Sequence, residues 1–151
     1  MSVVVRDVVP GDLDAWMELF HAYRAFYQKE RDPDVAEAVW NWVNDPWHEV
    51  RSLVAEVDGE IVGIGNYRTF SRPIIGGAGI WLDDLYTSEA ARGRGVASAI
   101  LARLSEIAAN EGASLVRWIT ADDNATARSL YDKEAVQTPW ITYDKAPAEE
   151  G

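Results

Sequence analysis

The sequence has 151 residues, of which 48% are apolar, and its 25 acidic and 14 basic residues give a formal net charge of −11. A chain of this length can bury one hydrophobic core, so we expect a single domain over residues 1–151 with a loose tail over 146–151. The acidic charge argues against nucleic acid as a partner, and the absence of cysteine excludes disulfides, zinc–thiolate centres and a cysteine acyl-enzyme. Because the sequence has no long apolar run, we expect a cytoplasmic protein that does not enter a membrane.

The first half of the chain predicts a strand, two helices and a β-hairpin. The strand ends at Pro10-Gly11, and Asp12 is the expected N-cap of the first helix. The hairpin is predicted because Asp58-Gly59, which favours a tight turn, separates two runs of β-forming residues. The predicted ranges are 3–9 for the first strand, 35–43 for the second helix, and 52–57 and 60–70 for the hairpin strands, and one face of the first helix consists of Leu13, Trp16, Met17, Phe20, Tyr23 and Tyr27.

The second half predicts a strand, a long helix and a return strand, followed by a short helix and a last strand. The long helix carries apolar residues at helical spacing and ends at Gly112, a typical C-terminal cap. In chain order the elements read βααβββαβαβ. This order predicts an α/β domain with a mixed sheet, in which antiparallel hairpins precede a β-α-β crossover. The predicted ranges are 80–87, 96–110, 114–120, 124–133 and 139–144.

The segment Arg92-Gly93-Arg94-Gly95-Val96-Ala97, between the strand and the long helix, carries the clearest chemical signal. Glycines at alternate positions allow successive backbone N–H groups to converge, and the partly positive N-terminus of the helix points into the same space. These features predict a site for a bridging phosphate. The spacing matches neither G-x-G-x-x-G nor G-x-x-x-x-G-K-[ST], which excludes a dinucleotide fingerprint and a nucleoside-triphosphate loop.

The pattern of this segment is R-x-x-G-x-A, and it resembles the pyrophosphate loop of the GNAT acetyltransferases, which bind acetyl-CoA. Residues 81–87 before the loop, and residues 119–124 and 129–133 after it, are similar to the family's segments in order and spacing. The resemblance implies the GNAT-type acyl-CoA N-acyltransferase fold, an α/β fold with a mixed central sheet flanked by helices. It also implies an N-acetyltransferase with acetyl-CoA as cosubstrate.

Within the family, Asp83-Asp84, the segment 67–71 and the block 124–133 are most similar to the diamine and polyamine acetyltransferases. The resemblance to that subgroup implies a small-molecule amine on a cation as the substrate, and a homodimer in which the 139–144 strand is a contact. Two other interpretations keep the chemistry but take a peptide or protein lysine, or an amine antibiotic, as the acceptor. A further one is a non-catalytic module that binds acyl-CoA as a sensor.

The family's coenzyme contacts transfer to this sequence by position. They imply that the end of the strand contacts the pantetheine arm, that the glycine-rich segment holds the pyrophosphate, and that Tyr131 faces the thioester sulfur. Where the family usually has a Gly-Phe pair after this tyrosine, this sequence has Glu134-Ala135-Val136. The implied cofactor-binding residues are Leu85, Tyr86, Thr87, Arg92, Gly93, Arg94, Gly95, Val96, Ala97, Asn124 and Lys133.

Tyr131 is the expected catalytic residue. It follows Asn124 by two helical turns, about 10 Å along one face, so one extended ligand can contact both side chains. A phenol with an ordinary pKa of about 10 is a suitable donor to a leaving thiolate, whose thiol has a similar affinity for protons. The alternative is a tyrosine that is only packed, half-buried, against its neighbours.

Asp83 and Asp84 are the expected substrate-binding residues. They lie among apolar neighbours in a strand, where carboxylates are costly unless water, cations or donors reach them. Since successive strand residues point to opposite sides, only one of the two is expected to line a given cleft unless a bulge intervenes. The alternative is a structural ion pair with Arg68 or Arg117.

The protonation of the substrate constrains the role of these carboxylates. An alkylamine with a pKa of about 10.4 is neutral in only about 1 molecule in 2,500 at pH 7, and a nearby carboxylate raises that pKa further. An aspartate beside the reacting nitrogen must therefore accept its proton through water, or else bind the non-reacting end of a diamine, which is the role favoured for Asp83 and Asp84. His21 and His48 lie far apart in the sequence, so we expect no metal.

Overall fold

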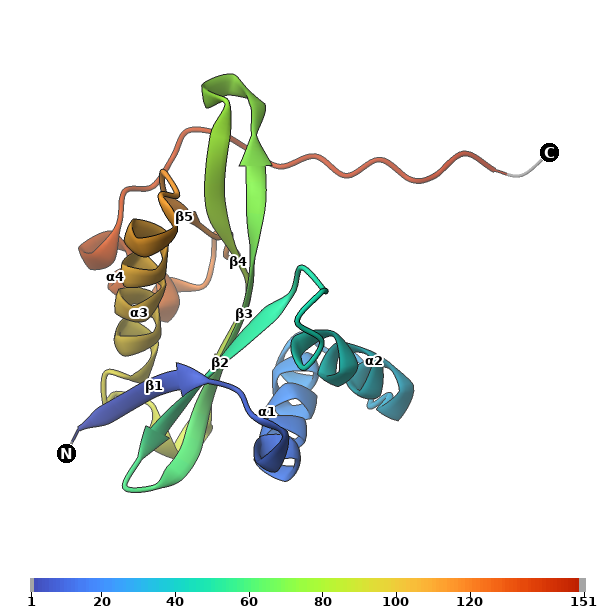
Figure 1. Ribbon diagram of the computed structural model, residues 1–151, viewed down its shortest axis with the longest axis vertical. Coiled ribbons are helices and arrows are strands. Elements are labelled where there is room, and N and C mark those ends of the chain that lie inside the picture. Colours follow the sequence, from blue (N-terminus) through green and yellow to red (C-terminus); the bar gives the residue numbers. More distant parts are fainter. Residues whose placement is uncertain (1, 150–151) are drawn as a thin grey trace. The chain divides into compact units, whose positions relative to one another are not determined.

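The computed structural model describes residues 2–149, and its contacts group the chain into two compact units, residues 1–119 and 120–151. The first unit is built on a five-stranded sheet in the order β1-β2-β3-β4-β5. Strands β1 to β4 pair as antiparallel neighbours, and β5 pairs in parallel with β4 (Figure 1). The sheet is therefore mixed, with hairpins before a crossover, as the element order predicts.

The elements follow the predicted order up to the last predicted strand. The tight turn predicted at Asp58-Gly59 is confirmed, because both residues have positive φ, 53° and 80°, as a two-residue hairpin turn requires. In the first unit the strands are β1 (Val3–Asp7), β2 (Arg51–Val57), β3 (Glu60–Arg72), β4 (Gly77–Thr87) and β5 (Val116–Arg117); the helices are α1 (Leu13–Phe26), α2 (Pro33–Val43) and α3 (Val96–Glu111); and the short 3-10 turns are η1 (Pro10–Asp12), η2 (Pro73–Ile75) and η3 (Glu89–Ala91).

Helices α1 and α3 cover opposite faces of the sheet (Figure 1). Trp16 is fully buried at the centre of the core on the α1 face, and its ring stacks on that of Phe20 with 4.9 Å between centroids. Val54 and Ile64 complete this core from β2 and β3, and Ala36 adds to it from α2. The apolar face predicted for the first helix is thus the face that packs on the sheet.

On the opposite face, α3 approaches β3 very closely. A Cβ built on Gly63 would lie 2.6 Å from Val96 Cγ1, so only glycine allows the first turn of α3 to lie against the sheet at this point. Gly63 also pairs with Thr87, the last residue of β4. The close approach therefore sets the N-terminus of α3 beside the end of β4.

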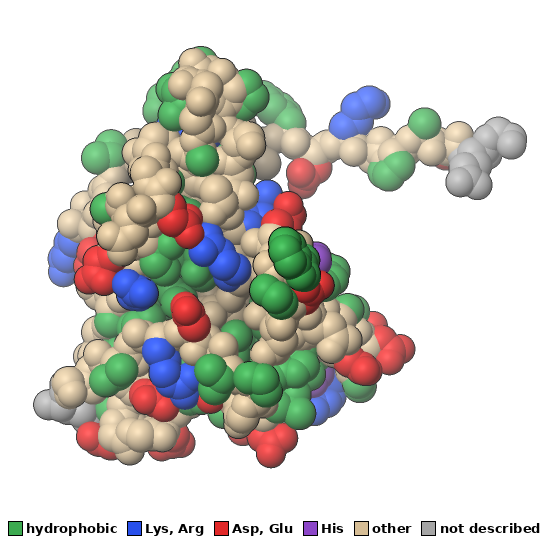
Figure 2. Space-filling view, in the orientation of Figure 1, with side chains coloured by type: hydrophobic (Ala, Val, Ile, Leu, Met, Phe, Trp, Pro, Cys, Tyr) green, Lys and Arg blue, Asp and Glu red, His purple; other side chains and the backbone are tan. Residues whose placement is uncertain are grey.

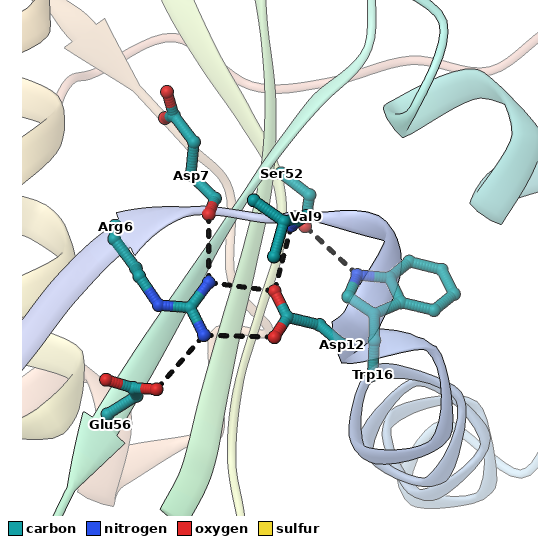
Figure 3. Close-up of polar contacts among 7 residues, drawn as sticks. All are labelled: Arg6, Asp7, Val9, Asp12, Trp16, Ser52 and Glu56. Carbon is teal, nitrogen blue, oxygen red and sulfur yellow. Dashed lines mark hydrogen bonds and ion pairs between the residues drawn. The ribbon is translucent and has the colours of Figure 1, made fainter. Parts of the chain in front are cut away.

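Asp12 anchors α1 to the sheet through its side chain instead of capping the helix. Its carboxylate accepts hydrogen bonds from the Arg6 guanidinium at 2.8 and 2.9 Å and from the Val9 N–H at 2.9 Å (Figure 3). One turn later, the Trp16 indole N–H donates to Ser52 Oγ of β2 at 3.0 Å. Asp12 precedes α1 as predicted, but the expected capping bond is not formed, because the guanidinium offers a stronger, charge-assisted partner than the helix N–H groups.

The second unit contains one helix in its described part, α4 (Ala125–Glu134), close to the predicted range. Residues 139–144, predicted as a strand, form neither helix nor strand, and β5 is shorter than the predicted 114–120. The last strand is wrong because an extended apolar segment becomes a strand only where a sheet edge pairs with it, and the sheet of residues 2–149 ends at β5. Of the predicted tail, 146–149 has no regular structure, and 150–151 lie outside the described residues.

None of the helices in residues 2–149 combines the length and the apolar character needed to cross a bilayer.

Replacing Asp12 by Asn tests the anchor of α1. We expect the variant to lose about 2 kcal/mol of unfolding free energy at pH 7, because Arg6 then keeps a single carboxylate partner, Glu56 at 3.0 Å. Arg6 lowers the pKa of Asp12 below its ordinary 3.8, so this contribution is present above that pH and is lost as the pH falls through the folded-state pKa. Urea denaturation from pH 7 down to pH 2 measures both effects.

The matched control is Asp14→Asn, an exposed carboxylate in the first turn of the same helix. It should change the unfolding free energy by less than about 0.5 kcal/mol. Equal losses in the two variants would contradict the anchoring role of Asp12.

Candidate active site

A β-bulge in β4 brings two carboxylates to one face of the sheet. Asn66 of β3 pairs with Asp84, and the next residue, Tyr67, pairs with Leu82, so Asp83 is an extra residue in the register. In a regular strand the two aspartates would point to opposite sides, whereas a bulge interrupts that alternation. Both carboxylates hydrogen-bond to side chains on the α1 face of β3. The bulge that both carboxylates need in order to share a cleft is therefore present.

The two carboxylates have different partners. Asp83 forms an ion pair with Arg68, whose Nε lies 3.1 Å from Asp83 Oδ2. Asp84 accepts a hydrogen bond from the Asn66 amide at 3.1 Å, and it lies close enough to the Tyr23 hydroxyl to raise the pKa of that group. Burial raises the pKa of Asp83 and the charge of Asp84 adds to this, while Arg68 opposes it. The ion pair expected as a structural alternative is formed, but by Asp83 alone.

Helix α1 places aromatic side chains beside these carboxylates. The ring of Tyr23 contacts those of Phe20, Tyr27 and Tyr86, with centroid distances of 6.2, 5.2 and 6.2 Å. Burial and the neighbouring Asp84 raise the pKa of Tyr23 well above its ordinary range, so the hydroxyl stays protonated and donates. The sequence assigns Tyr23 to the packed face of its helix and misses this contact, because helical spacing shows which residues are buried but not what a hydroxyl meets.

Asn66 is a second functional candidate that the sequence analysis does not single out. It is fully buried in the middle of β3 and contacts Asp84 across the strands. The sequence does contain a signal for Asn66, namely an amide inside an apolar strand. Such a group is costly to bury without a hydrogen-bond partner, so its presence indicates that a polar partner lies nearby.

The edge of β4 that faces β5 is open over its second half. Strand β5 pairs with β4 only at Ile80 and Trp81, so within residues 2–149 no strand lies beside Leu82 to Thr87 on that side. Strand β3 covers the other edge of β4 along its length. Leu85, Tyr86 and Thr87, the residues predicted to contact the pantetheine arm, lie in this open stretch, where an extended ligand can add to the sheet through main-chain hydrogen bonds.

The glycine-rich segment 92–97 follows β4 and leads into α3. Gly93 and Gly95 both have a φ of 80°, and Gly95 is the N-cap of α3 without a side chain to cap it. A Cβ built on Gly95 meets nothing within 4 Å, so the space in front of the helix is open. The N–H groups of the first helical turn and the positive end of the helix dipole face this space, which suits a phosphate.

Arg92 adds positive charge beside this loop. Its Nε donates to the carbonyl oxygen of Thr87 at 3.3 Å, and its guanidinium lies 5.5 Å and 5.9 Å from the ring centres of Tyr86 and Phe26. Arg94, on the loop itself, is exposed. Arg92 thereby links the phosphate-type loop to the end of the strand that carries the carboxylates.

A cavity of about 290 Å³ lies on the α1 face beside Tyr86, with Glu18, Glu60 and Glu89 among its lining residues. The charge of Glu49 acts on Asp83 by raising its pKa. Figure 2 shows acidic and basic side chains next to one another on the visible face. Residues 2–149 contain no group of three or more His, Asp or Glu side chains placed to hold a metal ion.

The remaining predicted residues lie in the second unit, on or next to α4. Asn124 is the N-cap, and its Oδ1 accepts a hydrogen bond from the Ala127 N–H at 3.3 Å. Tyr131 lies near the end of the same helix, where its carbonyl accepts from the Ala135 N–H at 2.8 Å. Their helical spacing is confirmed, while the coenzyme contacts of Asn124, Tyr131 and Lys133 stay predictions.

The sequence model of the acetyltransferase (GNAT) family matches residues 16–135. The chain belongs to this family. A D-amino-acid N-acetyltransferase of Saccharomyces cerevisiae is 27% identical over 95% of this chain and 90% of its own length. An uncharacterised N-acetyltransferase of Bacillus subtilis is 32% identical over 88% of this chain and 89% of its own. This GNAT protein is an acetyl-CoA-dependent N-acetyltransferase, and the family expected from the R-x-x-G-x-A loop is confirmed.

Solved structures agree with the GNAT fold. A ribosomal-protein-alanine N-acetyltransferase from Brucella melitensis biovar Abortus 2308 has a TM-score of 0.81 at 20% identity, covering 97% of this chain and 99% of that one. An aminoglycoside N-acetyltransferase in complex with CoA has a TM-score of 0.83 at 16% identity, covering 97% and 96%. The predicted fold class, a GNAT-type acyl-CoA N-acyltransferase, is therefore confirmed.

Replacing Gly95 by Ala tests the phosphate role of the loop of this GNAT protein. The new methyl group lies in the open space before α3, so we expect CoA to bind at least about tenfold more weakly, a change of about 1.4 kcal/mol. The left-handed backbone also costs about 1–2 kcal/mol of unfolding free energy. Calorimetry with CoA and urea denaturation measure the two effects.

Gly112→Ala is the matched control, because Gly112 caps the other end of α3 with a φ of 71° and open space around it. We expect a similar loss of unfolding free energy and unchanged CoA binding. Equal weakening of CoA binding in both variants would contradict the assignment of the loop.

Proposed function

We propose that this GNAT acetyltransferase moves the acetyl group of acetyl-CoA to a primary amine of a small cation, with diamines and polyamines as the class that fits best. The observation that carries the proposal is the bulge at Asp83, which sets Asp83 and Asp84 on one face of the sheet. Two neighbouring carboxylates repel one another, so a cation beside them is stabilised more than a neutral or anionic acceptor.

In the proposed reaction the two carboxylates have different roles. Asp84 binds a cationic nitrogen of the substrate, since its own partners are neutral. Asp83 accepts a proton from the reacting nitrogen through a water molecule, and the raised pKa of Asp83 favours this role over the binding role expected for it. An acceptor that arrives protonated must be bound as a cation and must lose a proton from its reacting nitrogen. Asp84 provides the binding and Asp83 accepts the proton.

The transfer itself is direct. The neutral nitrogen attacks the thioester carbonyl carbon and loses a proton to water as the C–N bond forms. The C–S bond breaks, the Tyr131 hydroxyl protonates the leaving thiolate, and the tyrosine then regains a proton from solvent. No covalent enzyme intermediate forms, and most of the rate comes from holding amine and thioester in line. In this proposal residues 85–87 and 92–97, together with Asn124 and Lys133, hold the coenzyme.

A second acceptor class is an α-amino acid. Arg68 is about one third exposed beside Asp83, and its guanidinium can pair with the carboxylate of such an acceptor. The D-amino-acid N-acetyltransferase above supports this class, as does a thialysine N-epsilon-acetyltransferase of Bos taurus, 36% identical over 55% of this chain and 49% of its own length. The homodimer and the cytoplasmic location implied at the outset are proposals that rest on the subgroup resemblance and composition.

A panel of amines separates these acceptors. We expect thiol release from acetyl-CoA with putrescine to be at least about tenfold faster in kcat/KM than with butylamine, which has the same chain length and one charge fewer. D-alanine, thialysine, neamine and a lysine peptide complete the panel. Preference for an amino acid would favour the second class, and acetyl-CoA binding without turnover of any amine would favour a sensor.

A Tyr131→Phe variant tests the proton donor. We expect kcat to fall by about 10²-fold or more, with the KM for acetyl-CoA nearly unchanged, because only the transfer to the thiolate is lost. Tyr143→Phe is the control, since Tyr143 is 85% exposed outside any helix or strand. Undiminished turnover of the Tyr131 variant would remove this residue from the mechanism.

A further inference from the structure

We propose that Tyr23 and Asn66 are positioning residues for Asp84, and that together they make the acceptor site select a cation. The proposal rests on the proposed function, in which Asp84 binds a cationic nitrogen. Asn66 of β3 donates a hydrogen bond to Asp84, and Tyr23 of α1 lies close enough for this carboxylate to raise the pKa of its hydroxyl, so two elements distant in the sequence meet at Asp84. A residue that acts through Asp84 needs no contact of its own with the substrate.

Asn66 is better explained by this role than by stability. Its side chain is fully buried, and its Nδ2 donates to Asp84 Oδ2 at 3.1 Å. Its Oδ1 is buried without a hydrogen-bond partner among the described residues. The reverse orientation of the amide would set this oxygen against the carboxylate, so the donor must face Asp84. An apolar residue at this position would avoid the cost of burying an unpaired oxygen, but it could not donate a hydrogen bond to Asp84. The amide therefore provides a contact that an apolar side chain cannot.

Tyr23 is held as firmly as Asn66. Its ring packs between Phe20 and Tyr27 of its own helix and Tyr86 of β4, so rotation of the side chain would break three ring contacts. The ring is therefore fixed at a place where the charge of Asp84 acts on its hydroxyl. Because burial keeps that hydroxyl protonated, Tyr23 is a neutral donor, like the amide of Asn66.

Neutral donors orient a carboxylate and leave its charge in place. A guanidinium orients the carboxylate and also neutralises its charge. Among the ion pairs formed by residues 2–149, Asp83 has Arg68 as a partner and Asp84 has none. The charged groups that act on the neighbouring Asp83 are Arg68, Asp84 and Glu49, and the one cation among them, Arg68, forms its ion pair with Asp83. A substrate ammonium thus meets in Asp84 an oriented counter-ion that forms no ion pair with a cation of residues 2–149.

A double-mutant cycle with putrescine, or with the panel amine that the wild type acetylates fastest, tests the proposal. Tyr23→Phe keeps the ring and removes only the hydroxyl. We expect the KM for the amine to rise about tenfold, kcat to change less than about threefold, and the KM for acetyl-CoA to stay the same. In an Asp84→Asn background the same change should have less than about a twofold effect, because the carboxylate it orients is gone.

Asn66→Ala should follow the same pattern, and the Tyr23 cycle decides alone if that variant does not fold. Tyr27→Phe is the matched control: it loses a hydroxyl from the neighbouring ring, which is 49% exposed, and should leave the amine KM unchanged.

Two results separate this proposal from the function on which it rests. If Asp84→Asn raises the amine KM but Tyr23→Phe does not, or acts equally with and without Asp84, the positioning role is overturned and the function stands. If Asp84→Asn leaves the amine KM unchanged, or the wild type acetylates no amine, both are overturned.

Discussion

The extra residue in β4 is the constraint on which the rest of the site depends. Without the bulge at Asp83, strict alternation would turn one aspartate toward the α3 face, where Ile100 and Leu104 are fully buried and a carboxylate would have no water. A bulge also increases the local twist of its strand, and β4 loses its β5 partner directly before it, after Trp81. The acidic pair and the open edge for an extended ligand therefore arise at the same point of one strand.

The position of α1 links the stability of the fold to the chemistry of the site. Asp12 and Trp16 fix the start of the helix to β1 and β2 through Arg6 and Ser52 (Figure 3). Tyr23 lies two turns farther along the same face, so the anchor at one end of the helix sets the place of the hydroxyl at the other. A shift of α1 would cost core packing and would also move the Tyr23 hydroxyl away from Asp84.

The features that could be predicted from the sequence depend on local patterns of residues. The features that could not be predicted depend on how strands distant in the chain pair with one another. The backbone of the loop 92–97, the turn at Asp58-Gly59 and the helix that ends at Gly112 depend on residues close together in the chain, and the structure has the turn, the helix end and the left-handed glycines that they predict. The contact of Asn66 with Asp84 depends instead on the register between β3 and β4, which apolar alternation alone does not specify to one residue.

The same limit explains one wrong prediction, the strand at 139–144, and one expected hydrogen bond that is not formed, the cap of α1 by the Asp12 side chain. The apolar residues 139–144 favour an extended backbone, but whether they form a strand is decided by a sheet edge elsewhere. Asp12 has the residue type and place of an N-cap, but Arg6, on another element, competes for its carboxylate. In both cases the deciding group is remote in sequence and adjacent in space.

The net charge of −11 places opposite demands on the two substrates of this acetyltransferase. At long range the acidic chain attracts an amine and repels the phosphates of CoA. If CoA binds as proposed, the start of α3 offsets this repulsion locally, since main-chain N–H groups, the helix dipole and Arg92 act at contact, within the Debye length of about 8–10 Å. The visible face in Figure 2 also mixes both signs of charge, so the field close to the surface is uneven. Screening by salt therefore weakens the attraction of one substrate and the repulsion of the other, while the short contacts that hold each of them change little.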